Sequence, residues 1–142
     1  MNEDGRPAKK LAIVACMDAR VDPAKIMGLE RGDAHVIRNA GGVITEDAIR
    51  SLAISQSLLG TEEILLIHHT DCGMAAATDE EIKSRIEDRT GHRPHWHPEA
   101  IGDLDQSVRD SIAEIKENPY IPVRESVRGF VYDVETGELR EV

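Results

Sequence analysis

The sequence has few positive charges for its length, with 17 Lys and Arg against 27 Asp and Glu and a formal net charge of -10. Binding to nucleic-acid backbones depends largely on clustered Lys and Arg, so this deficit argues against a nucleic-acid partner. No apolar run reaches the roughly 20 residues that span a bilayer, and the opening MNEDGRPAKK lacks the apolar segment of a signal peptide. We therefore expect a cytoplasmic protein that does not engage a membrane and has small neutral or anionic ligands.

Cysteine is also scarce, and several chemical motifs are absent. Cys16 and Cys72 are the two cysteines and stand far apart, so a reducing compartment would keep them as thiols that are free for a metal or for chemistry. There is no C-x-x-C redox pair. A phosphatase loop needs an arginine six residues after its cysteine, where this chain has Asp22 and Thr78. Neither G-x-x-x-x-G-K-[ST] nor G-x-G-x-x-G occurs, which excludes these two nucleotide-binding loops.

The length of 142 residues fits one domain, residues 1–142, of which residues 1–10 are expected to form a short flexible N-terminal segment. Three apolar runs predict strands, at residues 11–15, 34–37 and 63–69. The first shows no alternation, as is typical of a strand buried on both faces of a parallel sheet.

A helix is predicted between the second and third strands. Thr45 can cap its first turn, apolar residues recur at helical spacing, and Gly60 can end it. A strand, a helix and a strand in this order imply a right-handed parallel crossover.

The second half of the chain predicts two more helices and a hairpin. Residues 78–90 form a highly charged helix with a solvated surface, residues 91–98 a loop, and residues 100–117 an amphipathic helix. Two alternating runs around Gly137 predict a β-hairpin. The fold class is therefore α/β, with a central mostly parallel β-sheet flanked by helices and an antiparallel addition at its C-terminal edge.

Chemically active side chains follow two of the predicted strands. Cys16, Asp18 and Arg20 come just after the first, and His69 and Cys72 lie at and after the end of the third. The carboxyl ends of parallel strands form the ligand crevice of such sheets, so neighbouring strands would bring both groups together. Two thiolates, an imidazole and a carboxylate form a donor set that a tetrahedral zinc site accepts. The predicted ligands are thus Cys16, Asp18, His69 and Cys72.

Arg20 suggests that Asp18 has two positions. An arginine offers a fixed fork of donors that can hold a carboxylate away from a metal. With Asp18 on Arg20 the fourth zinc position is open, and with Asp18 on zinc the site is closed and inactive. His68, next to His69, is expected to point to the opposite face as a packing residue or a partner of the ligands. Asp71 is either a hydrogen-bond acceptor near the site or a turn-forming residue.

The motifs CMDAR and HTDCG, with RNAGG between them at residues 38–42, resemble the β-class carbonic anhydrases, and most closely their shorter actinobacterial members. The similarity extends from Leu11 to the C-terminus. It implies four parallel strands with a further edge strand, in a homodimer or a dimer of dimers with active sites at the dimer interface. It also implies a zinc lyase (carbonate dehydratase) that reversibly hydrates carbon dioxide to bicarbonate and a proton. Zinc-bound hydroxide would be the nucleophile, with Asp18 and Arg20 as catalytic residues that gate the fourth zinc position.

Two departures from the family pattern leave alternatives open. Relatives usually carry N-terminal helices that wrap the partner subunit, whereas about ten residues precede the first strand here. Residues 75–77 are three alanines where relatives often place larger apolar side chains near the pocket. The alternatives are a hydrolase of carbonyl sulfide or carbon disulfide on the same zinc site, and a non-catalytic zinc or bicarbonate-binding module. Candidates for the proton carrier, by residue type alone, are His35, His92, His95 and His97.

Overall fold

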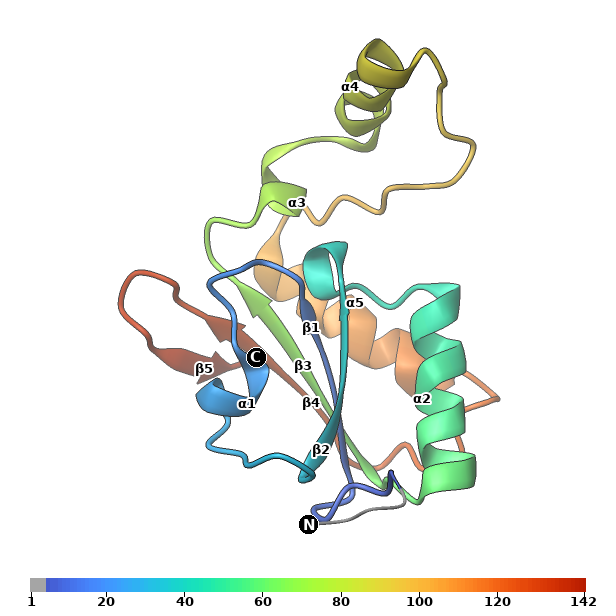
Figure 1. Ribbon diagram of the computed structural model, residues 1–142, viewed down its shortest axis with the longest axis vertical. Helices are drawn as coiled ribbons and strands as arrows, with labels where there is room; N and C mark the ends of the chain where they lie inside the picture. Colours follow the sequence, from blue (N-terminus) through green and yellow to red (C-terminus); the bar gives the residue numbers. More distant parts are fainter. Residues whose placement is uncertain (1–4) are drawn as a thin grey trace.

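A five-stranded sheet forms the centre of the computed structural model, which describes residues 5–142 (Figure 1). The strand order is β2-β1-β3-β4-β5; the first four strands run parallel, and β5 pairs antiparallel with β4. The strands are β1 (Leu11–Cys16), β2 (Ala34–Asn39), β3 (Glu63–His69), β4 (Val127–Tyr132) and β5 (Leu139–Glu141). The fold class predicted from the sequence is confirmed, including the antiparallel strand at the C-terminal edge.

Helices cover the two faces of this sheet unequally. The helical segments are α1 (Pro23–Ile26), the 3-10 turn η1 (Ala40–Gly42), α2 (Glu46–Leu59), α3 (Gly73–Ala76), α4 (Asp79–Thr90) and α5 (Leu104–Glu117). Helices α2 and α5 lie over one face, where Leu52 and Ile115 pack against the strands (Figure 1). The other face is covered by the short α1 and by the chain around it, including Val21 and Ile26.

Strand β1 is buried along its whole length, as its unbroken apolar run predicts. Ala12 and Val14 belong to the core under α2 and α5, whereas Ile13 and Ala15 belong to the core on the opposite face. Strand β3 alternates in the same way: Ile64 and Leu66 belong to the first core, and Leu65 and Ile67 to the second. The two central strands are therefore held from both sides, and the segments that follow them start from fixed positions.

Local signals account for the ends of α2. The Thr45 hydroxyl accepts a hydrogen bond from the Ala48 amide, and Gly60 ends the helix at a φ of 77°. A left-handed conformation of this kind costs glycine little because it has no Cβ. The predicted helix and its parallel crossover are confirmed.

Helix α5 begins later than predicted, at Leu104 instead of residue 100. Gly102 has a φ of 72°, and the carboxylate of Asp103 accepts the Gln106 amide as the helix cap. A capping residue lies outside the helix by definition, so the residues before it take another conformation. Ala100 donates its amide to Asp79 instead, over a distance of 2.7 Å.

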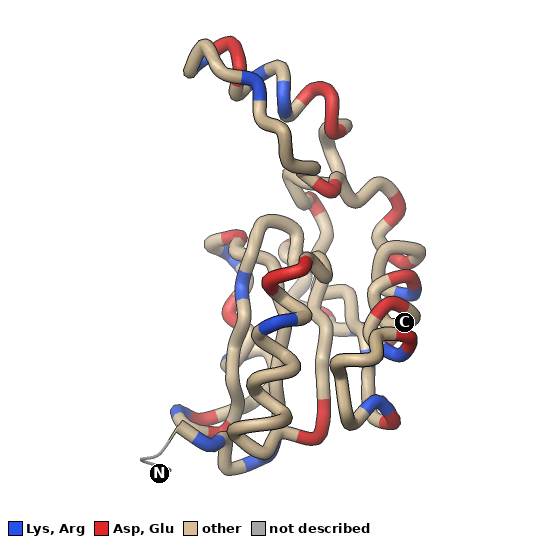
Figure 2. The backbone as a smooth tube through the Cα atoms, turned by 90° about the vertical axis from the view of Figure 1, so that its right-hand side faces the viewer, with Lys and Arg blue, Asp and Glu red and all other residues tan. Residues whose placement is uncertain are grey.

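Helix α4 and the loop after it form an arm, residues 78–102, that projects away from the sheet (Figure 1). No residue of α4 is buried, and charges of both signs lie along it (Figure 2), as the predicted solvated helix requires. Arg93 ties the loop back to α4 through Glu80 and Glu87. At the base, the Ile101 amide donates to the Met74 carbonyl. The arm is thus held by polar contacts within it and by a backbone bond to α3 at its base.

The predicted flexible segment, residues 1–10, is described only from residue 5 onward, and the rest of it lies outside the described residues. Ala8 and Lys9 donate their amides to the carbonyls of Gly32 and Asp33. Among residues 5–142, no helix combines the length and the apolar character that crossing a membrane requires.

At Gly129, β4 lies close against α5. A Cβ atom there would lie 2.2 Å from Cγ1 of Val108 and 3.1 Å from Cδ1 of Ile112. We expect Gly129→Ala to lower the free energy of unfolding by about 1–3 kcal/mol, because overpacking displaces α5. Urea unfolding followed by circular dichroism measures this. Gly73→Ala, where a Cβ meets nothing within 4 Å, is the control, and equal losses in both variants would contradict the close approach.

Candidate metal centre

Three buried side chains meet at the carboxyl edge of the sheet. Cys16 ends β1, His69 ends β3, and Cys72 stands just before α3, with ligand atoms that all lie within 4.8 Å of one another. Because β1 and β3 are direct neighbours in the sheet, the two sequence motifs converge here. The structure therefore brings together three of the four ligands proposed from the sequence.

The imidazole of His69 is oriented for a ligand. Its Nδ1 lies 2.7 Å from the carbonyl oxygen of Thr70, and since a carbonyl only accepts, Nδ1 carries the proton. Nε2 is the ring nitrogen left to act as a ligand, and it is buried without a hydrogen-bond partner. A buried polar atom without a partner costs free energy, which a metal ion at this position would remove.

The two thiols complete a donor set for zinc. Burial raises the pKa of the Cys72 thiol, the neighbouring Cys16 raises it further, and the amides of Met74 and Ala75 at the start of α3 oppose both effects. A divalent cation binds the thiolate and reverses the effect of burial. Two cysteine sulfurs and one histidine nitrogen, all buried, match the ligands and the coordination of a zinc site that keeps one position open. The residues fit zinc.

Asp18 lies beside these three side chains instead of among them. Its Oδ2 is 3.8 Å from Nε2 of His69, too far for a hydrogen bond. Arg20 holds it through three bonds: Nη2 to Oδ2 at 2.8 Å, Nε to Oδ1 at 3.0 Å, and the backbone amide to Oδ1 at 2.8 Å. These bonds hold the pKa of Asp18 well below its usual range. The carboxylate is therefore charged. Of the two positions predicted for it, on Arg20 or among the metal ligands, it occupies the one on Arg20.

Arg20 also joins the two motif loops. Its Nη1 donates to Oδ2 of Asp71 at 3.0 Å, and its Nη2 donates to the Asp71 carbonyl at 3.0 Å. The carboxylates of Asp18 and Asp71 together raise the pKa of Arg20. Asp71 has a φ of 53°, so it serves both roles left open by the sequence, as an acceptor for Arg20 and as a turn residue.

The end of β2 and the turn η1 after it support the Cys16 backbone. The Met17 amide donates to the Asn39 carbonyl at 2.8 Å. Gly42 has a φ of 66°, and a Cβ on it would lie 2.8 Å from the Cys16 amide nitrogen. The Met17–Asn39 bond joins backbone groups that every residue except proline possesses, so the sequence does not predict it, whereas the close approach at position 42 requires glycine. His68, fully buried, donates Nε2–H to the Gly42 carbonyl at 3.3 Å, and burial lowers its pKa.

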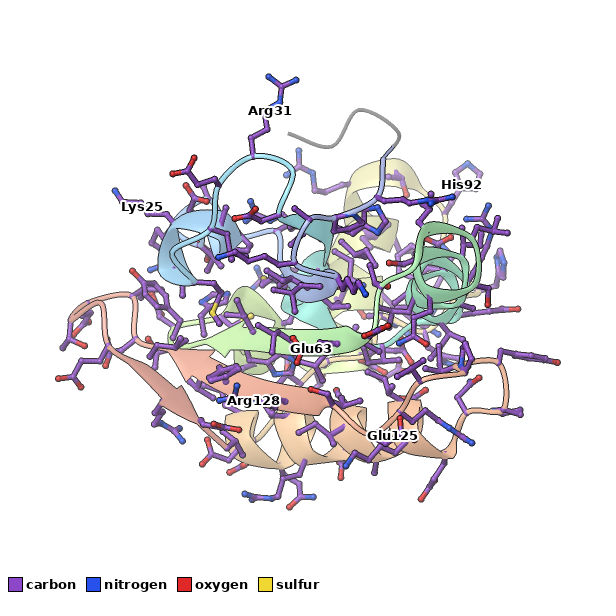
Figure 3. All side chains as sticks on the ribbon, turned by 90° about the horizontal axis from the view of Figure 1, so that it is seen from below. Lys25, Arg31, Glu63, His92, Glu125 and Arg128 are labelled. Carbon is purple, nitrogen blue, oxygen red and sulfur yellow. The ribbon has the colours of Figure 1, made fainter. Side chains whose placement is uncertain are left out.

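The four other histidines lie elsewhere. His35 pairs with Ala12, four residues before Cys16 on β1, so it lies away from the carboxyl edge of the sheet. Its ring forms hydrogen bonds with the Ser55 hydroxyl and the Gly5 carbonyl. The other three lie exposed in the loop of the arm; His92 is labelled in Figure 3. They are His92, His95 and His97. A role in proton transfer remains a prediction for all four.

Known proteins resemble this chain over nearly its whole length. The family model described as carbonic anhydrase matches residues 11–139. Beta-carbonic anhydrase 1 of Mycobacterium tuberculosis is 57% identical over 136 residues, which cover 96% of this chain and 83% of that protein. A carbon disulfide hydrolase of Acidithiobacillus thiooxidans is 35% identical over 153 residues, covering 93% of this chain and 76% of that protein.

Solved structures agree with this relationship. The carbonic anhydrase of Streptococcus mutans superimposes with a TM-score of 0.93 at 43% identity, covering 97% of this chain and 84% of that one. The apo form of a carbon disulfide hydrolase superimposes with a TM-score of 0.84 at 31% identity, covering 96% and 80%. These matches cover nearly the whole chain, and the matched fold carries the Cys16, His69 and Cys72 cluster. This chain belongs to the carbonic anhydrases, and within them to the β class.

Proposed function

We propose that the protein catalyses the reversible hydration of carbon dioxide to bicarbonate and a proton, as a carbonate dehydratase. The observation that carries this proposal is the buried Cys16, His69 and Cys72 donor set with a charged Asp18 held beside it. The mycobacterial relative, named Beta-carbonic anhydrase 1, supports it. Zinc, when bound, acidifies a water ligand and so supplies a nucleophile near neutral pH.

Within this proposal, Asp18 orients the attacking oxygen. A charged carboxylate only accepts hydrogen bonds, so it can hold the remaining hydroxyl proton and direct a lone pair toward the carbon of carbon dioxide. Arg20 fixes the carboxylate by bonds to both of its oxygens and keeps it ionised. Cys16, His69 and Cys72 serve as the permanent metal ligands, and Asp18 as one that exchanges with Arg20.

The position of Asp18 also bears on the non-catalytic alternative. A permanently closed zinc site would need Asp18 as a fixed fourth ligand. Here the carboxylate has two strong contacts with the Arg20 guanidinium, yet it lies 3.8 Å from the His69 nitrogen. This arrangement favours a site whose fourth position opens for a reactant.

Sulfur substrates are the second candidate, because relatives named carbon disulfide hydrolase are 31% to 35% identical to this chain. Residues 75–77 and Ile101 help to line a surface pocket of about 380 Å³ next to α3. The higher identity to the mycobacterial carbonic anhydrase favours carbon dioxide.

We also propose that the protein forms a homodimer or a dimer of dimers. Strand β2 is an edge of the sheet, and its apolar Val36, 43% exposed, lines a surface pocket together with Ile54 of α2, which is 36% exposed. Exposed apolar residues along an unpaired strand favour pairing with another chain.

We also propose a cytoplasmic location, since the ligand cysteines must stay reduced to bind zinc.

Stopped-flow hydration of carbon dioxide tests the activity. We expect zinc-loaded wild-type protein to be active, Cys72→Ser to lose zinc and activity, and Asp18→Asn to keep zinc but lose at least about 100-fold in kcat, since its amide no longer orients the nucleophile as a charged acceptor. Asp105→Asn, which alters a surface pair with Arg140, is the matched control and should retain wild-type activity. Faster turnover of carbon disulfide than of carbon dioxide would transfer the proposal to the sulfur substrates.

The activity should rise between about pH 6.5 and 9. Hydrogen bonds from Arg20 hold the pKa of Asp18 far below this range, so its carboxylate stays charged throughout and its protonation does not cause the rise. The rise would come from loss of a proton by the water that bound zinc acidifies, with Asp18 remaining on Arg20 and out of the metal ligands. The measurement is kcat against pH at constant ionic strength, and a flat profile contradicts the mechanism.

Sedimentation velocity tests the edge-strand dimer. We expect Val36→Lys to shift the protein toward monomer, because a charge on an edge strand opposes pairing between sheets. Thr136→Lys, in the exposed turn between β4 and β5, adds the same charge far from β2 and should leave the oligomer unchanged. Equal sedimentation of wild type and Val36→Lys would rule out this interface.

A further inference from the structure

The side chain of Arg38 reaches from β2 over the end of β1 to the loop that carries the catalytic residues. Its Nη2 donates to the carbonyl oxygens of Cys16 at 3.0 Å, Asp18 at 2.8 Å and Val21 at 2.7 Å. Its Nε donates to the Cys16 carbonyl as well, at 3.1 Å. One guanidinium therefore gathers three carbonyls from residues 16–21, which we call the CMDAR loop.

These contacts differ from those of Arg20. A guanidinium fork usually pairs with a carboxylate, and Arg20 does so with both Asp18 and Asp71. Arg38 contacts backbone carbonyls, so its role concerns the path of the chain. A loop that turns three carbonyls toward one point needs a donor there, because carbonyls in close proximity repel one another.

Asp18 is consequently held at both ends. Arg20 binds its carboxylate, while Arg38 binds its carbonyl oxygen. The bonds from Arg20 are geometrically strict, since both the guanidinium and the backbone amide of Arg20 must reach the same Oδ1. That geometry requires a defined backbone from residue 18 to residue 20, and the Val21 amide reinforces it by donating to the Asp18 carbonyl at 3.0 Å.

We propose that Arg38 is a positioning residue for catalysis: by clamping the carbonyls of the CMDAR loop, it keeps Asp18 on Arg20 and thus keeps the metal centre open. This proposal rests on the proposed function. Without the clamp, the loop gains freedom, the strict contacts to Arg20 weaken, and the carboxylate, 3.8 Å from Nε2 of His69, moves among the metal ligands. Arg38 acts only through the loop, so its loss should change kcat more than KM.

The test compares Arg38→Met with wild type in the zinc-loaded protein. Methionine keeps much of the apolar stem but has no donors, and because Arg38 is exposed, the change leaves no buried cavity. We expect retained zinc, a kcat for carbon dioxide hydration lower by about 10- to 100-fold, and a nearly constant KM. Hydrogen exchange, read by NMR, should show the Arg20 and Val21 amides exchanging at least about 10-fold faster, because both bond to Asp18.

Arg128→Met is the matched control. Arg128 lies on β4, is labelled in Figure 3, and pairs with Glu141 on the exposed edge of the sheet. Its replacement removes the same donors but should leave kcat and the exchange of the Arg20 and Val21 amides at wild-type values. Unchanged exchange and kcat in Arg38→Met would overturn the proposal, as would equal effects from both substitutions.

Arg38→Lys decides the matter if the methionine variant does not fold. Lysine keeps the charge but replaces the planar fork with one ammonium group. We therefore expect the Arg20 and Val21 amides to exchange faster than in wild type but more slowly than in a loop without any clamp. Wild-type exchange and kcat in this variant would overturn the clamp. The exchange measurement does not depend on the substrate, so faster exchange in a protein whose wild type fails to hydrate carbon dioxide would refute the proposed function and leave the clamp in place.

Discussion

The parallel pairing of β1 with β3 is the constraint on which the site depends. Ala15 pairs with Ile67 in this register, so Cys16 and His69 emerge at the same edge of the sheet although 53 positions separate them along the chain. Both strands are packed on two faces, and neither can slide without exposing one of the two cores. Packing of the two strands thus fixes where Cys16 and His69 begin, and hydrogen bonds such as that from His69 Nδ1 to the Thr70 carbonyl set the final orientation.

The side chains at this edge of the sheet fall into a buried group and a charged, partly exposed group. Cys16, His69 and Cys72 are removed from water, and the His69 ring already has its proton committed to a carbonyl, so the free donors suit a cation. Asp18 and Arg20 lie at the boundary with solvent, where the ion pair between them is partly screened by water. The three clustered donors are thus buried, whereas the carboxylate beside them is charged and partly exposed.

The sequence allowed much of this to be predicted, and the exceptions have physical reasons. Buried strands and the capped helix α2 leave clear patterns, and the arginine two residues after Asp18 indicated that the carboxylate has a second partner. The start of α5 was placed too early because an amphipathic pattern does not mark its boundary, whereas the cap at Asp103 does. The contacts of Arg38 could not be predicted, since its partners are carbonyls that every residue possesses.

The arm, residues 78–102, projects from the sheet and adds no residue of α4 to the core (Figure 1). Arg93 bonds to Glu87 within the arm, the Ala100 amide bonds to Asp79 across its base, and no residue of α4 is buried. The contact of the arm with the ligand-bearing part of the chain is made at its base, where the Ile101 amide donates to the Met74 carbonyl. Evolution, or an engineer grafting the arm of one family member onto another, can reshape the surroundings of α3 while the folding of the catalytic domain stays the same.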